Sequence, residues 1–269
     1  MANMEYWIYL NGVPFTVDTV NNELQYGDRL HEPVSLNHLK DEGQFYSLLL
    51  NRSDNSLFTG MLHAAEENAD VIRLVIPKVV FEERFWDNDA QINSINKMSY
   101  ERDWNILAVN QPLFDRLNGN YPLIDIAGSE FVIDLRHREL QKYKSWDVRI
   151  DLDELYKNKL GQYEGFYDLK TQQICSSSKA IEAGAQNVVG IIIPEDTKLD
   201  PFVSAPGQGA AAMKFIAGHP VSALLVATIL PASEMKSAQE MMKNQQNAKQ
   251  PPVLKHDQTG KARRKGKRL

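Results

Sequence analysis

The chain has 269 residues, of which 43% are hydrophobic and 24% are charged, and its formal net charge is −5 at pH 7. This composition is that of an ordinary globular protein, long enough to bury one large core or two smaller ones. The single cysteine, Cys175, excludes an internal disulfide, so apolar packing must hold the fold together, as is usual in a reducing compartment. We therefore expect a cytoplasmic protein.

The sequence gives no indication of secretion or membrane insertion. Residues 1–15 lack a basic first region, and polar side chains interrupt their apolar residues, so they are unlike a secretory signal. The longest apolar stretch, residues 210–230, is broken into pieces too short to span a bilayer about 30 Å thick. The interrupting residues are Lys214, Gly218, His219 and Pro220. No membrane partner is expected.

The charge of the chain is distributed unevenly. Residues 255–269 hold seven basic side chains and one acid, a local charge of +6, so residues 1–254 carry −11. An acidic body repels phosphates, so any affinity for DNA or RNA must come from the basic segment. Its candidate nucleic-acid contacts are Lys261, Arg263, Arg264, Lys265, Lys267 and Arg268. A tail that only aids solubility is the alternative interpretation.

The clearest local pattern lies in residues 6–17, at the start of the chain. Apolar residues alternate on both sides of Asn11-Gly12, two residues that tolerate the positive φ of a type I′ turn. The pattern predicts a β-hairpin in which Ile8 faces Phe15 across the ladder.

Two more strand regions are expected before the middle of the chain. Residues 45–62 are typical of a second hairpin with a polar turn near residues 52–55, and the β-branched run 71–76 is typical of a strand. The polar residues 86–103 are expected to be a connection that can hold a helix, and they are the best candidate for a domain boundary. After them, residues 104–109 predict a strand, and Asn110 is placed to cap a short helix.

The third predicted hairpin carries the candidate catalytic residues. Apolar alternation on both sides of Gly128-Ser129, a pair suited to a type II′ turn, predicts a hairpin across residues 124–135 with Ile126 facing Phe131. In this register two carboxylates are diagonal neighbours on the outward face, and a third lies beside the turn. They are Asp125, Asp134 and Glu130. The alternative is a solvated sheet face without a catalytic role.

Further along, residues 148–150 predict a short strand, and Asp151 is placed to cap a helix that runs to residue 160. Residues 166–174 have hairpin character, and residues 188–193 are typical of a buried strand. From residue 210 onward the pattern is helical, first in the apolar stretch and then in a helix capped by Ser233.

These elements favour an α+β fold over a doubly wound parallel sheet, because strand and helix do not alternate regularly. We expect mostly antiparallel β-hairpins, C-terminal helices and a disordered basic tail. The expected organisation is a β-rich N-terminal module in residues 1–85, a connection in 86–103, an α+β module in 104–248 and the tail in 249–269. The two modules can also form one domain.

Motifs for cofactors and metals find little support. Residues 207–212 match the dinucleotide fingerprint G-x-G-x-x-A before a helix, but no strand directly precedes them, so a helix-entry loop is the better interpretation. The six histidines include no pair at ligand spacing, and Cys175 has no second cysteine beside it. The sequence therefore predicts no cofactor and no metal site of these types.

The leading hypothesis is a non-enzymatic binding or accessory protein whose basic tail gives weak, sequence-independent contact with DNA or RNA. One alternative is a metal-dependent hydrolase that uses the carboxylates of the 124–135 hairpin. The other is a structural or assembly subunit that docks a protein partner through Trp7 and Tyr9, the aromatic residues on one face of the first hairpin.

Overall fold

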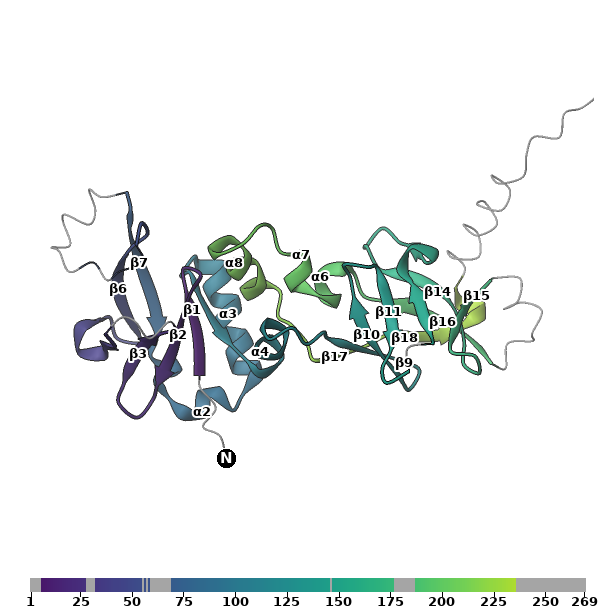
Figure 1. Ribbon diagram of the computed structural model, residues 1–269, viewed down its shortest axis with the longest axis horizontal. Helices are drawn as coiled ribbons and strands as arrows, with labels where there is room; N and C mark the ends of the chain where they lie inside the picture. The colour runs from purple at the N-terminus through teal and green to yellow at the C-terminus, as the bar shows by residue number, and fades with distance from the viewer. Residues whose placement is uncertain are drawn as a thin grey trace, which may run out of the picture.

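The computed structural model describes residues 6–27, 32–54, 56, 58, 69–145, 147–176 and 187–235. Two lobes lie side by side along the longest axis of the molecule (Figure 1), and each is built around sheets that are mainly antiparallel. The first lobe contains the described residues of 6–117 and 210–218, and the second contains the described residues of 123–193 and 224–235. The expected α+β class is confirmed.

The first lobe contains a five-stranded sheet with the strand order β4-β3-β2-β1-β8. Its strands are β1 (Tyr6–Leu10), β2 (Val13–Asp18), β3 (Glu23–Tyr26), β4 (Val34–Ser35) and β8 (Ile106–Val109). β1 and β2 form the predicted first hairpin, with Ile8 opposite Phe15 and positive φ at Asn11 and Gly12. Both the turn and the register of this prediction are confirmed.

A second sheet shares the core of the first lobe. Its three strands are β5 (Lys40–Asp41), β6 (Phe45–Asn51) and β7 (Val71–Pro77). Leu50 and Ile76 are fully buried in the same hydrophobic cluster as Ile8, so the two sheets enclose one core. After β6 the N–H of Asn51 donates to the carbonyl of Ser56 at 2.9 Å and closes the predicted polar turn. Most of the predicted return strand lies outside the described residues.

The polar segment that was expected to be a connection is helical and packs in the core of the first lobe. It follows the 3-10 turn η2 (Lys78–Phe81) and contains α2 (Glu83–Trp86) and α3 (Asp89–Arg102). Asn96 of α3 exchanges hydrogen bonds of 2.7 and 2.8 Å with the backbone of Ala108 in β8. The hydroxyl of Ser99 likewise bonds the backbone of Ile106. These polar residues cover the edge of β8, so the N-terminal core extends at least to Ala108.

A helix from the second half of the chain completes the first lobe. α8 (Ala210–Gly218) lies against α3 and β8 (Figure 1), and its Ile216 is buried with residues of β8 and α4. α4 (Gln111–Leu117) begins after the predicted cap Asn110, whose side chain accepts a hydrogen bond from the N–H of Leu113 at 3.1 Å. The chain therefore enters the second lobe after α4 and returns to the first lobe in α8.

Two five-stranded sheets form the second lobe. The first has the order β12-β11-β10-β9-β17, with β9 (Leu123–Ile126), β10 (Ser129–Asp134), β11 (Glu139–Lys142), β12 (Arg149–Asp151) and β17 (Leu224–Val226). The second contains β13 (Tyr156–Lys157), β14 (Tyr163–Asp168), β15 (Gln173–Cys175), β16 (Val188–Ile193) and β18 (Thr228–Pro231). Ile124, Phe131, Tyr163 and Ile191 are buried in one cluster that both sheets share. The short helices α6 (Asp196–Leu199) and α7 (Pro201–Ser204) lead back toward the first lobe.

Two helix predictions in the second lobe are wrong. The helix expected after Asp151 is a single 3-10 turn, η3 (Leu152–Glu154), because the next residues pair with β14 as β13. The apolar residues that follow Pro220 form β17 and β18 instead of a helix. Their composition suits either state, and pairing with β9 and β16, which are distant in sequence, selects the strand.

The last described element is the 3-10 turn η4 (Ala232–Glu234). The helix predicted beyond Ser233 and the basic tail of residues 249–269 lie outside the described residues. Within the described part of the chain, no helix is both long and apolar enough to cross a membrane.

Candidate functional site

The turn of the third hairpin lies one residue earlier than predicted. Ala127 and Gly128 both have positive φ, which makes a type I′ turn instead of the expected type II′ turn. The carboxylate of Asp125 accepts a hydrogen bond from the N–H of Gly128 at 2.8 Å and holds this turn. Phe131 therefore faces Ile124 instead of the predicted partner Ile126. The buried residues still point inward, because a shift of two residues preserves the faces of a strand.

The corrected register brings two of the three candidate carboxylates together. Asp125 and Glu130, hereafter the acidic pair, lie directly opposite each other on the outer face of the sheet. Asp134 lies at the other end of β10, where one carboxylate oxygen is 2.8 Å from the ring of His137. Partial burial alone would raise the pKa of Asp134, but hydrogen bonds from the ring and backbone of His137 lower it. The hydrogen bond between the ring and the carboxylate raises the pKa of His137. The three carboxylates do not form one acid–base site.

The outer face of this sheet places apolar side chains beside the acidic pair. Leu224 of β17, Leu123 of β9 and Val132 of β10 are neighbours in one row across the strands. Val226 of β17 lies in the next row, beside the acidic pair. Leu224 and Val226 are 48% and 68% exposed, and both lie on the same face of β17. We name this surface, made of Leu123, Asp125, Glu130, Val132, Leu224 and Val226, the β17 face.

A polar network surrounds the hydroxyl of Tyr163 on β14. This hydroxyl donates to Asp196 and accepts hydrogen bonds from Arg138 at 3.0 Å and from Lys157 at 3.2 Å. Lys157 also bonds Asp196 at 2.8 Å, and Arg138 bonds Asp153. The bond to Asp153 raises the pKa of Arg138, and the bond to Asp196 raises the pKa of Lys157. These groups pair with one another, so the network braces β13, β14 and α6.

Two tyrosines of β14 provide a matched test of this network. Both side chains are 1% exposed, but the hydroxyl of Tyr167 forms no hydrogen bond with a charged group among the described residues. Its burial outweighs the contact with the side chain of Ser129 and raises the pKa of Tyr167 to about 12. We expect Tyr163→Phe to lower the free energy of unfolding by about 1–2 kcal/mol, because it removes a shared partner of three charged groups. Tyr167→Phe should change it by less than about 0.5 kcal/mol. If the two variants lose equal free energy of unfolding in urea, the hydroxyl of Tyr163 does not stabilise the network.

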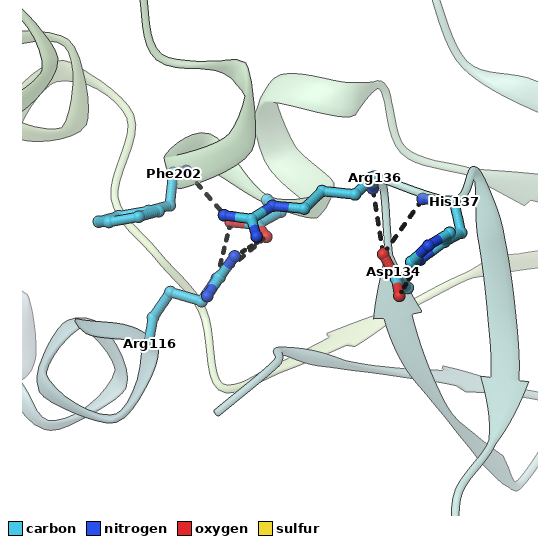
Figure 2. A network of polar contacts seen from close by, with 6 residues as sticks. Arg116, Asp134, Arg136, His137 and Phe202 are labelled. Atoms are coloured by element: carbon cyan, nitrogen blue, oxygen red, sulfur yellow. Dashed lines mark hydrogen bonds and ion pairs between the residues drawn. The ribbon is translucent and has the colours of Figure 1, made fainter. Parts of the chain in front are cut away.

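A buried ion pair joins α4 of the first lobe to the segment of α6 and α7, whose Leu199 is buried in the core of the second lobe (Figure 2). Arg116 of α4 and Asp200, between α6 and α7, are 6% and 0% exposed, and Nη2 lies 2.9 Å from Oδ2. The Nε–H of Arg116 donates to both carboxylate oxygens, at 3.0 and 3.2 Å. The rings of Tyr121 and Phe202 lie 5.0 Å from the guanidinium. Figure 2 shows the side chain of Arg136, two residues after the end of β10, pointing toward this pair.

Sequence reasoning missed both of these polar groups. Asp200 follows Arg116 by 84 residues, and Asp196 follows Tyr163 by 33 residues. Such partners carry no local pattern, because the pairing exists only after the chain has folded. The apolar residues that follow Asp200, residues 201–203, are a weak signal of its burial, whereas the residues around Asp196 are polar and give none. Neither stretch identifies a partner.

The aromatic residues of the first hairpin are partly covered by the chain itself. Trp7 and Tyr9 are half-buried and pack against the cluster formed by β8, α4 and α8. Burial raises the pKa of Tyr9. The surface on which the first-hairpin docking hypothesis depends is thus partly covered by this cluster.

Other candidate groups do not converge. Within the described ranges, no three His, Cys, Asp or Glu side chains gather closely enough to hold a metal ion. Cys175 is buried at the end of β15. The six basic residues expected to contact nucleic acid lie outside the described residues.

Comparison of the chain with models of protein families, with curated protein sequences and with solved structures found no match.

Proposed function

We propose that the protein is a non-enzymatic binding or accessory protein. The observation that carries this proposal is the β17 face, where exposed apolar side chains lie beside the acidic pair at the edge of a sheet. Exposed apolar side chains at a sheet edge are typical of a protein contact. The separation of Asp134 from the acidic pair gives the hydrolase alternative less support, because acid–base catalysis needs its groups within reach of one substrate.

The second part of the proposal is weak contact with DNA or RNA through the basic residues 261–268. Its support is the segregation of charge, since residues 255–269 carry +6 and the rest of the chain carries −11. Lys and Arg side chains that neutralise phosphates release counterions, so such binding is independent of sequence and sensitive to salt. Because its one cysteine excludes an internal disulfide, we also propose the cytoplasm as its compartment.

A salt titration tests the nucleic-acid part. If about four to six phosphates are engaged, the logarithm of the binding constant for a labelled DNA duplex should fall with the logarithm of salt with a slope of about −4 to −5. Charge reversal of Arg263, Arg264 and Lys265 should abolish binding, and so should truncation before Lys255. Binding by the truncated protein, or binding that ignores salt, would show that the folded body recognises nucleic acid instead.

A further inference from the structure

β17 is the open edge of its sheet. Among the described residues it pairs only with β9, in parallel orientation. The carbonyl of Ala223 accepts a hydrogen bond from β9 at 3.0 Å, and the N–H of Ala227 donates to β9 at 2.9 Å. Because alternate residues of a strand bond to the same neighbour, the backbone groups of Leu224 and Val226 point to the opposite side. A further strand could pair with them there.

The side chains of the same two residues lie on the outer face of the sheet. Leu224 continues the apolar row that begins with Val132 and Leu123, and it ends that row at the open edge. A strand added beside β17 would extend the row with its own apolar side chain and would cover Leu224 and Val226, which are both more than one third exposed.

The acidic pair determines the charge that such a strand should carry. Like charges directly opposite each other destabilise a sheet unless a cation lies beside them. Among the described residues neither carboxylate forms an ion pair, and the hydrogen bond that Asp125 accepts from the turn leaves its charge in place. Both carboxylates lie in the row of Val226, so the long side chain of a lysine or arginine in that row of an added strand would extend over Val226 toward Asp125, which is two strand spacings of about 4.8 Å away. Glu130 lies one strand farther and adds attraction at longer range. The same charges repel phosphates, which argues against nucleic acid or a phospholipid surface here.

We propose that β17 binds an extended segment of a partner protein by β-strand addition. The segment presents an apolar residue beside Leu224 and, two residues away on the same face, a lysine or arginine beside Val226, with its side chain directed toward Asp125. Main-chain hydrogen bonds to the open edge supply affinity, and this spacing supplies specificity. The inference rests on the proposed role as a binding protein and adds the chemistry of the partner.

The test uses the full chain and a fluorescein-labelled synthetic peptide, Ser-Lys-Thr-Val-Thr-Lys-Ser, which offers the required spacing in both strand directions. Fluorescence anisotropy should show saturable binding. Glu130→Lys, three strands from the added residue, should weaken it by about threefold, because a distant attraction becomes repulsion. Asp125→Asn, which keeps the acceptor for the turn, removes the nearer charge and should weaken it at least as much. Glu101→Lys is the matched control, because it changes net charge equally on α3 and should leave binding unchanged.

Val226→Pro tests the backbone contribution. It removes an N–H that points to the open edge, and it leaves the hydrogen bonds between β17 and β9 in place. Peptide binding should be lost while the midpoint of thermal unfolding shows that the protein is still folded. If Val226→Pro unfolds the protein, N-methylation of the peptide valine and of the threonine after it provides a backbone test from the ligand side, because one of these two N–H groups points to β17 in either strand direction.

Three results would overturn this proposal. One is that a peptide with glutamate in place of lysine binds with equal affinity. Another is that Glu101→Lys weakens peptide binding as much as Glu130→Lys does. The third is peptide binding that emerges only after deletion of residues 249–269, which would assign the edge to the chain's own C-terminal segment. The DNA titration reports separately on the basic tail. If the full chain binds the peptide but not DNA, only the nucleic-acid part of the proposed function is contradicted.

Discussion

Asp200→Asn is expected to lower the free energy of unfolding by about 3–5 kcal/mol. The substitution keeps the size of the side chain and the acceptor for the N–H of Phe202, at 3.1 Å, but it removes the charge. The guanidinium of Arg116, which is 6% exposed, would then remain buried between two aromatic rings without its counter-charge. Urea unfolding followed by tryptophan fluorescence and by far-ultraviolet circular dichroism measures the loss.

The matched control is Asp103→Asn. Asp103 also pairs with a basic side chain, Lys214, at 2.5 Å, but it is 71% exposed and has positive φ, which asparagine tolerates. Its replacement should change stability by less than about 0.5 kcal/mol. In the double variant Arg116→Met with Asp200→Asn, the loss should be smaller than the sum of the single losses, because no buried charge is left alone. Additive losses would show that the ion pair does not act as a unit.

Gly12→Ala is the second substitution with a large expected effect, a loss of about 2–4 kcal/mol. Gly12 has φ of +83°, and a methyl group built on it would lie 2.7 Å from the backbone nitrogen of Ala210. The turn of the first hairpin therefore packs directly against the first residue of α8. The cost combines backbone strain with a clash against a main chain that cannot move without shifting the helix.

Gly43→Ala separates these two contributions. Gly43 has nearly the same φ, +82°, but its added methyl group would meet no atom within 4 Å. Gly43→Ala should lower the free energy of unfolding by about 1 kcal/mol, from backbone strain alone. The difference between the two variants in urea unfolding measures the contact between the turn and α8. If the two losses are equal, that contact contributes nothing to stability.

Several elements could be predicted because short-range chemistry determines them. Asn11-Gly12 tolerates the positive φ that a type I′ turn requires, so the turn and the register of the first hairpin follow from adjacent residues. Asn110 caps α4 through a hydrogen bond to a residue three positions along the chain. The apolar run of β16 is long enough for a strand and too short for a buried helix.

The errors occurred where two local solutions had similar energies. Ala127-Gly128 and Gly128-Ser129 both keep the apolar residues of the third hairpin inward, so alternation could not choose between them. Residues 86–103 were interpreted as a connection that can hold a helix, and α3 is that helix, but the pattern did not show that Asn96 and Ser99 are buried against the backbone of β8. Polarity alone does not distinguish a solvated linker from a helix whose side chains form hydrogen bonds with the backbone of an edge strand.

The sequence by itself determined the α+β class, the first hairpin, the cap of α4 and the contrast between an acidic body and a basic end. Only the tertiary structure decided that residues 224–226 form an edge strand and that the acidic pair lies beside Val226. It also decided the pairing of Arg116 with Asp200 across 84 residues. The physical reason is the range of the interactions. Turns and caps are closed by neighbouring atoms, whereas strand partners and buried ion pairs are selected by a core that must first bring distant residues together.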